Sequence, residues 1–172
     1  MNPKLSLIYS RRSVRRFESR PVPADMIRDL LAAGMAAPSA CAKDPWHVVV
    51  VTERAMLRRL AEGLPNGTML GDAAAGLVVC GDLETAYDRQ ISYLLQDCSA
   101  MIENVLIAAA ALDLGACWLG VHPREDRIAH VRRVLNIPPA VVPVSAIAVG
   151  WPAERKEPRT RFQGGRVHEG TW

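Results

Sequence analysis

The stretch DCSAMIENVLIAAAALDLG, residues 97–115, decides how this 172-residue chain folds. Its apolar residues recur at helical spacing and cover nearly the whole circumference of the predicted helix. A helix that is apolar all round must be buried on all sides. In so small a chain a partner subunit is the simplest cover, and a central position within one subunit is the alternative. The stretch therefore predicts either an oligomer interface or a helix at the centre of the core.

The composition predicts one folded domain, over residues 1–172, with affinity for an anionic ligand. The length falls within the usual size of a single domain. Charged residues make up 23%, which excludes a disordered chain. The mean hydropathy of +0.05 is high for a small soluble monomer, so a buried oligomer interface is expected. The net charge of +3 suits an anionic ligand and is too small to indicate nucleic acid.

Targeting and redox features predict a cytoplasmic protein. The apolar run LSLIY, residues 5–9, is too short for the core of a signal peptide. No apolar run reaches the roughly 18 residues that a transmembrane helix needs, so no membrane contact is expected. The four cysteines lie far apart without a C-x-x-C motif, and the four histidines are scattered, so neither disulfides nor a metal site is expected.

Hydrophobic periodicity predicts helices and strands along the rest of the chain. Besides residues 97–115, helices are expected at 3–10, 23–37, 53–63 and 124–136. Buried strands are expected at 46–52 and 76–82, and further strands at 116–121 and 141–152. Thr52 is expected to cap a helix that Gly63 closes, and Pro123 to lie in the first turn of the last helix.

The composition changes abruptly after Pro152. Residues 153–172 are polar, charged and rich in glycine, and they offer little material for a core. Phe162 and Trp172 are the exceptions and are expected to act as anchors. The segment is therefore predicted to be an extended arm lying on a surface, that of a partner subunit.

Arginines are concentrated in the segment SRRSVRRF, residues 10–17. If a strand begins at Ser13, then Ser13, Arg15 and Phe17 share one of its sides. Guanidinium groups bind phosphate bidentately, and a serine hydroxyl adds a donor. The alternative is a solvated basic patch without a ligand.

A second arginine pair, Arg159 and Arg161, lies in the predicted arm. Being two residues apart, the pair faces one side of an extended chain. Ordering such an arm costs on the order of 1 kcal/mol per residue. Docking onto a bound anion would offset part of that cost, so both chain ends are predicted to meet at a phosphate group.

Four motifs resemble the FMN-dependent nitroreductase family in its short, single-domain form. RRSVRRF (11–17) resembles an Arg-Arg-Ser-Val-Arg-x-Phe signature, and AAPSACAKDPWHVVVV (36–51) resembles an Ala-Pro-Ser-x-x-Asn-x-Gln-Pro-Trp segment followed by a strand. LGACWLGVHP (114–123) resembles a Gly-x-x-x-Trp-x-Gly-x-x-x-Pro stretch. EPRTRF and VHEGTW, within residues 157–172, resemble the C-terminal arm of the family. The motifs occur in the family's order over nearly the whole chain.

The resemblance implies an α+β fold, with a mixed, mainly antiparallel sheet flanked by helices. It also implies an intertwined homodimer with two FMN sites at its interface. By motif position, the implied FMN contacts at the phosphate and ribityl chain are Arg11, Arg12, Ser13, Arg159 and Arg161. At the ring they are Arg15, Leu119 and Gly120, with Pro38, Ser39 and Ala40 approaching from the other subunit, and Ala42 is a further implied cofactor contact.

Two residues depart from the family pattern. Ala42 stands where the family often has Asn, which removes a polar contact to the flavin. Asp44 stands where the family often has Gln, and it either brings a negative charge near the cofactor or begins a turn before Pro45. Trp46 and Trp118 are expected in the core.

The resemblance implies hydride transfer from NADH or NADPH to flavin N5, followed by reduction of a nitroaromatic, a quinone or a similar electron-poor acceptor in ping-pong fashion. Arg15 is then expected to stabilise the reduced flavin, and no side chain is expected to act as a catalytic acid. Residues 64–72 are the expected lid. The alternatives are a specialised FMN enzyme such as a dehalogenase, an FMN storage or sensing protein, and a nucleic-acid binder, which the scarcity of interleaved aromatics disfavours.

Overall fold

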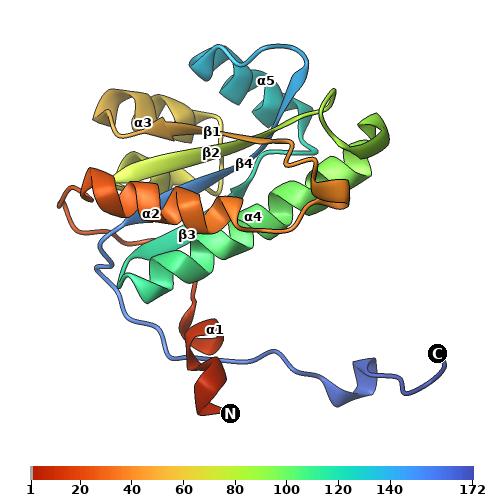
Figure 1. Ribbon diagram of the computed structural model, residues 1–172. Coiled ribbons are helices and arrows are strands. Elements are labelled where there is room, and N and C mark those ends of the chain that lie inside the picture. The colour runs from red at the N-terminus through yellow and green to blue at the C-terminus, as the bar shows by residue number, and fades with distance from the viewer. Residues whose placement is uncertain (1) are drawn as a thin grey trace.

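A four-stranded sheet forms the centre of the computed structural model, which describes residues 2–172 (Figure 1). The strands are β1 (Trp46–Val51), β2 (Ala75–Asp82), β3 (Gly115–Gly120) and β4 (Val141–Gly150). They pair in the order β1-β2-β4-β3, antiparallel throughout. The parallel contribution is an isolated bridge between Ser13 and Ala116. The predicted α+β fold with a mainly antiparallel sheet is confirmed.

Two layers of helices cover the sheet, one on each face (Figure 1). The helices α2 (Ala24–Met35) and α4 (Ile91–Ala111) pack on one face, and α3 (Arg54–Glu62) and α5 (Glu125–Leu135) pack on the other. The central strand β2 is apolar on both sides because it lies between these layers. Its side chains alternate, so that Leu77 belongs to one core cluster and Val78 to the other.

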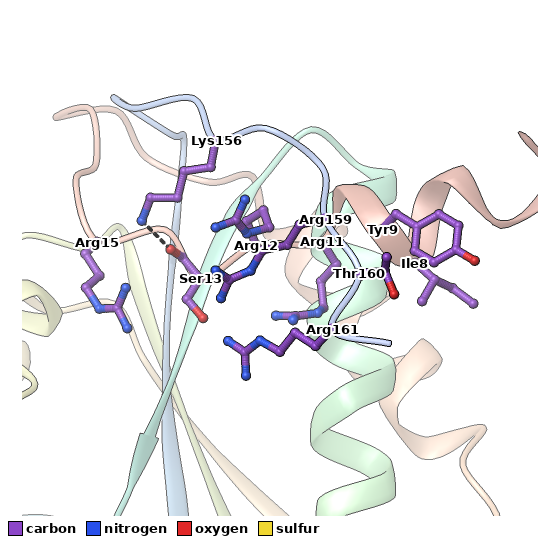
Figure 2. A pocket seen from close by; sticks show the side chains of 10 residues that line it. All are labelled: Ile8, Tyr9, Arg11, Arg12, Ser13, Arg15, Lys156, Arg159, Thr160 and Arg161. Carbon is purple, nitrogen blue, oxygen red and sulfur yellow. Dashed lines mark hydrogen bonds between the residues drawn. The ribbon is translucent and has the colours of Figure 1, made fainter. Parts of the chain in front are cut away.

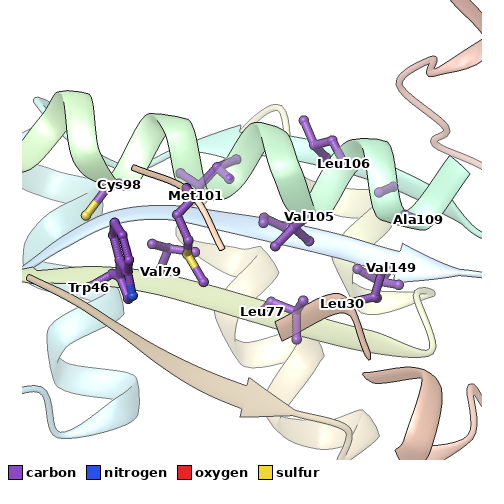
Figure 3. Packing of buried hydrophobic residues seen from close by; sticks show 14 of the residues in the cluster. Leu30, Trp46, Leu77, Val79, Cys98, Met101, Val105, Leu106, Ala109 and Val149 are labelled. Atoms are coloured by element: carbon purple, nitrogen blue, oxygen red, sulfur yellow. The ribbon is translucent and has the colours of Figure 1, made fainter. Parts of the chain in front are cut away.

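Helix α4 occupies the centre of the larger core cluster (Figure 3). Met101 and Val105 are fully buried there, among residues of β2 and α2. A Cβ on Gly34 of α2 would lie 2.7 Å from Val105 Cγ2, so the glycine permits close packing of the two helices. The helix is long and apolar enough to cross a bilayer by length and composition alone, and eight of its residues are buried within the described chain. Packing within one subunit, which was the alternative to an oligomer interface, therefore covers much of the apolar surface of α4.

Four local predictions are wrong. Strand β1 is not fully buried, since it lies at the sheet edge and Val50 is 40% exposed. Glu53, not Thr52, caps α3, because its carboxylate accepts from the amides of Ala55 and Met56 at 2.9 and 3.0 Å. Pro123 precedes α5 instead of lying in its first turn. Residues 13–17 form isolated bridges, to Ala116 and Pro152, and no strand.

The two chain ends lie together on one side of the sheet (Figure 1). The short helix α1 (Ser6–Ser10) contacts the C-terminal arm where the amide of Arg159 donates to the carbonyl of Tyr9 at 3.1 Å. Beyond that point the arm runs away from the body of the chain, with Phe162 76% exposed and Trp172 fully exposed. These two aromatic residues do not anchor the arm to their own chain.

The cysteines should react with thiol reagents very unequally. Burial raises the pKa of Cys80 and of Cys98 to about 12, and it also raises the pKa of Cys117, so all three remain protonated thiols at neutral pH. Cys41 is exposed. In a colorimetric thiol titration we expect Cys41 to supply the first equivalent to react, and the other three thiols to react only after denaturation. A Cys41→Ser variant should lose the fast equivalent, and a second fast thiol in that variant would contradict the buried packing of the others.

Candidate functional site

A cationic pocket of about 420 Å³, here called the arginine pocket, lies between the two chain ends (Figure 2). It contains all six polar residues that were predicted for the FMN phosphate and the pyrimidine edge. Its lining residues are Ile8, Tyr9, Arg11, Arg12, Ser13, Arg15, Lys156, Arg159, Thr160 and Arg161. Six of these side chains are cationic and none is a carboxylate. The arginines of the two chain ends, 140 or more residues apart, therefore line a single pocket.

Backbone hydrogen bonds hold both walls of the pocket in place. After α1 the chain is extended, and the amide of Val14 donates to the carbonyl of Ala116 on β3 at 2.9 Å. The arm returns alongside this segment, where Lys156 Nζ donates to the carbonyl of Ser13 at 2.6 Å. Figure 2 shows Arg15 on one side of Ser13 and the other arginines on the opposite side.

Only part of the positive charge in the pocket is neutralised. Arg11 pairs with Glu103 at 3.1 Å, and Lys156 pairs with Glu154 at 3.0 Å. Arg12 donates to the neutral carbonyl of Glu157. The nearby cations, Arg161 first and then Arg12, lower the pKa of Arg159, which shows that these guanidinium groups repel one another. An anion placed among them would relieve this repulsion and fill the bidentate donors.

A second cavity of about 500 Å³, here called the edge pocket, lies along the free edge of β3. It is lined by Arg15, Leu64, Asn66, Gly67, Thr68, Met69, Cys117, Trp118, Leu119, Gly120 and Arg127. Leu119 and Gly120, which the resemblance implies at the flavin ring, both line this cavity. A Cβ on Gly120 would meet no atom within 4 Å, so open space lies over this backbone. Arg15 lines both pockets, which makes them neighbours.

Arg127 and the predicted lid form two walls of the edge pocket. Arg127 Nη1 donates to the carbonyl of Gly120 at 2.8 Å, while its buried Nε has no partner within residues 2–172. The predicted lid, residues 64–72, forms one wall and contains a turn of 3₁₀ helix at Thr68–Gly71.

The segment with Pro38, Ser39, Ala40 and Ala42 does not reach either pocket of its own chain. It leads into β1, and the strand order places β1 and β3 at opposite edges of the sheet. Its contacts are internal: the amide of Ala40 donates to Asp97 Oδ1 at 2.9 Å. Within one chain, the segment therefore lies apart from both pockets.

Asp44 closes the same segment into a tight turn. Ser39 Oγ donates to Asp44 Oδ1 at 2.5 Å, and the amide of Asp44 donates back to Ser39 Oγ at 2.9 Å. Of the two readings of Asp44, its hydrogen bonds support the start of a turn before Pro45. Ala42 has a φ of 51°, a left-handed conformation that Asn adopts more readily than Ala, so the family's usual residue fits this backbone better.

Sequence reasoning missed several residues that line the pockets. Lys156 lies in the predicted arm, and its proximity to Arg159 was the available signal. Asn66 and Arg127 carry no local signal, because a loop amide and a surface arginine on a helix are ordinary features. Trp118 was expected in the core but is 37% exposed and lines the edge pocket, whereas Trp46 is buried as expected.

The fold is an antiparallel sheet between two helical layers, and a cationic pocket lies beside an open cavity at the edge of this sheet. These features define the class as an α+β protein that binds a phosphorylated ligand. The sequence profile of the nitroreductase family matches residues 8–151, and the chain belongs to that family. It is therefore an oxidoreductase, as its motifs predicted.

Several similar proteins match nearly the whole chain. A protein of Methanothermobacter thermautotrophicus named "Putative NADH dehydrogenase/NAD(P)H nitroreductase" is 41% identical, over 98% of this chain and 87% of its own length. A crystal structure of the same name from Parabacteroides distasonis matches with a TM-score of 0.92 and 38% identity, covering 100% of both chains. A nitroreductase-type structure from Desulfovibrio desulfuricans, described as "in complex with fmn", matches with a TM-score of 0.85 and 29% identity, over 100% of this chain and 99% of the other.

Proposed function

We propose that this protein is an FMN-dependent oxidoreductase that takes hydride from NADH or NADPH and reduces small electron-poor acceptors such as nitroaromatics or quinones. The observation that carries the proposal is the convergence of six cationic side chains on one pocket that adjoins the edge pocket through Arg15. The names of the relatives, which include NAD(P)H and FMN, agree with this assignment.

The residues of the two pockets fit FMN. A phosphate group matches the unneutralised guanidinium groups and the Ser13 hydroxyl of the arginine pocket. The flat ring matches the edge pocket, where open space lies over Gly120 and Leu119 supplies an apolar wall. The chemistry that FMN supplies when bound is the transfer of hydride from a nicotinamide to an acceptor.

Arg15 is the residue that acts on this chemistry most directly. Its amide donates to Glu154 Oε1 at 2.6 Å, which fixes its backbone, and its side chain lies between the two pockets. A fixed positive charge at that place stabilises negative charge on the pyrimidine side of a reduced ring without reorganisation. Nicotinamide and acceptor would occupy the open side of the edge pocket in turn, as a ping-pong mechanism requires.

A homodimer completes the proposed site. Pro38, Ser39, Ala40 and Ala42 would approach the ring from the partner, since they lie at the far edge of their own sheet. Asp97 contacts this segment through Oδ1, while its buried Oδ2 has no hydrogen-bond partner within the described chain. Buried acceptors rarely lack a hydrogen bond. The exposed aromatic residues of the arm offer a further surface to the partner.

We propose that the protein is located in the cytoplasm, because its cysteines are free thiols.

A visible spectrum tests the function. The purified protein should be yellow, should bleach when NADH or NADPH is added without oxygen, and should recover its colour when a nitroaromatic or a quinone follows. Yellow protein that neither nucleotide bleaches would identify an FMN-binding protein without nicotinamide turnover. Bleached protein that only a halogenated acceptor reoxidises would identify a dehalogenase. Colourless protein that does not take up added FMN would end the proposal.

A further inference from the structure

A third cavity, of about 460 Å³ and here called the second basic pocket, has no role in the function proposed above. It is lined by Arg16, Phe17, Ser19, Arg54, Arg58, Asp72 and Ala153, together with Arg15. Four of these side chains are cations and one is an anion, so the pocket carries a net positive charge. Asp72 forms no ion pair within residues 2–172, so the four arginines are not neutralised locally.

The walls of this pocket are held by hydrogen bonds and are therefore a built feature. Arg54 Nη1 donates to the carbonyls of Gly71 and Ala73 at 2.6 and 2.9 Å, which fixes its guanidinium group against the turn before β2. The carbonyl of Arg16 accepts from the amide of Ala153 at 2.8 Å. Arg16 and Arg58 are exposed side chains on these fixed walls, and neither forms an ion pair within residues 2–172.

The second basic pocket adjoins both pockets of the proposed FMN site, because Arg15 lines all three. The arginine pocket is already assigned to the FMN phosphate. For a dinucleotide with its nicotinamide in the edge pocket, the second basic pocket is then the neighbouring cationic cavity left for its adenosine phosphates, since the two cavities share Arg15.

We propose, on the basis of the proposed function, that the second basic pocket binds the 2′-phosphate of NADPH and makes this enzyme prefer NADPH to NADH. The two nucleotides differ only in that group, which is close to dianionic at neutral pH. Arginine is the side chain that accommodates the 2′-phosphate in NADP-dependent proteins, through bidentate hydrogen bonds. Arg16 and Arg58 supply such donors, and Arg54 adds a fixed positive charge.

The kinetic test compares the double variant Arg16→Ala/Arg58→Ala with the unaltered enzyme. We expect kcat/KM for NADPH to fall by about 100-fold, because two charge-assisted contacts are lost, and kcat/KM for NADH to change less than about 3-fold. Arg28→Ala, which removes an exposed arginine from α2 outside all three pockets, is the control. Arg58→Lys should keep part of the preference because it keeps the charge. An equal fall for both nucleotides would overturn the proposal.

A binding test does not depend on turnover. Adenosine 2′,5′-bisphosphate and AMP are titrated into the FMN-loaded protein by calorimetry, and the bisphosphate should bind at least 10-fold more tightly. The double variant should bind the two probes equally. Equal binding by the unaltered protein would overturn the proposal even if both nucleotides reduce the flavin. If neither NADH nor NADPH reduces the flavin, the proposed function fails. The titration still shows whether the second basic pocket binds a 2′-phosphate.

Discussion

Replacing Arg11 and Arg161 together with alanine is expected to release FMN from the purified protein. Both side chains line the arginine pocket, one from each chain end. A hydrogen bond to a charged group contributes about 1.5–3 kcal/mol net, so loss of two costs about 3–6 kcal/mol of binding. That range corresponds to a dissociation constant at least 100-fold higher. The ratio of flavin to protein absorbance after gel filtration measures the loss.

The single variants should rank in a definite order. Arg11 already pairs with Glu103, whereas Arg161 forms no ion pair in the described part of the chain. Arg161→Ala should therefore weaken FMN binding more than Arg11→Ala does. The matched control is Arg28→Ala with Arg166→Ala, which removes two exposed arginines outside the pocket and the same net charge. Full flavin occupancy in the double variant would show that the phosphate lies elsewhere.

The convergence of the chain ends was predictable because an arginine pair in a coreless arm needs a ligand to order it. Arg159 and Arg161 do line one pocket with Arg11 and Arg12. Residues 76–82 and 97–115 were predictable as largely buried elements, since β2 lies between two helical layers and α4 buries eight residues against the sheet and α2. In both cases the local pattern predicted burial or convergence, while the choice between its alternative explanations needed the tertiary structure.

The remaining features depend on tertiary structure that local patterns do not encode. The valines of β1 look like a buried strand, but burial depends on strand order, and β1 has a neighbour on one side only. Thr52 and Glu53 are adjacent acceptors, and backbone geometry decides which one caps α3. Asn66 and Arg127 line the edge pocket because a loop and a helix from different parts of the chain meet at β3.

Leu77→Ala is expected to lower the free energy of unfolding by about 3 kcal/mol. Leu77 is fully buried at the centre of β2, in the cluster formed with α2 and α4. The truncation removes apolar contacts and leaves a cavity between the sheet and the helices, which the surrounding residues fill only in part. Such changes cost about 2–5 kcal/mol of stability. Urea unfolding, followed by far-UV circular dichroism, measures the change through the transition midpoint.

Val50→Ala is the matched control for that measurement, because Val50 lies directly opposite Leu77 on β1 and is 40% exposed. Its truncation should cost less than about 1 kcal/mol, since the side chain is only partly removed from water. Both variants must be compared without FMN and at equal protein concentration, because ligand and subunit binding stabilise the folded state by mass action. A loss at Val50 equal to that at Leu77 would contradict the exposure of Val50 and would mean that a partner subunit covers β1 in solution.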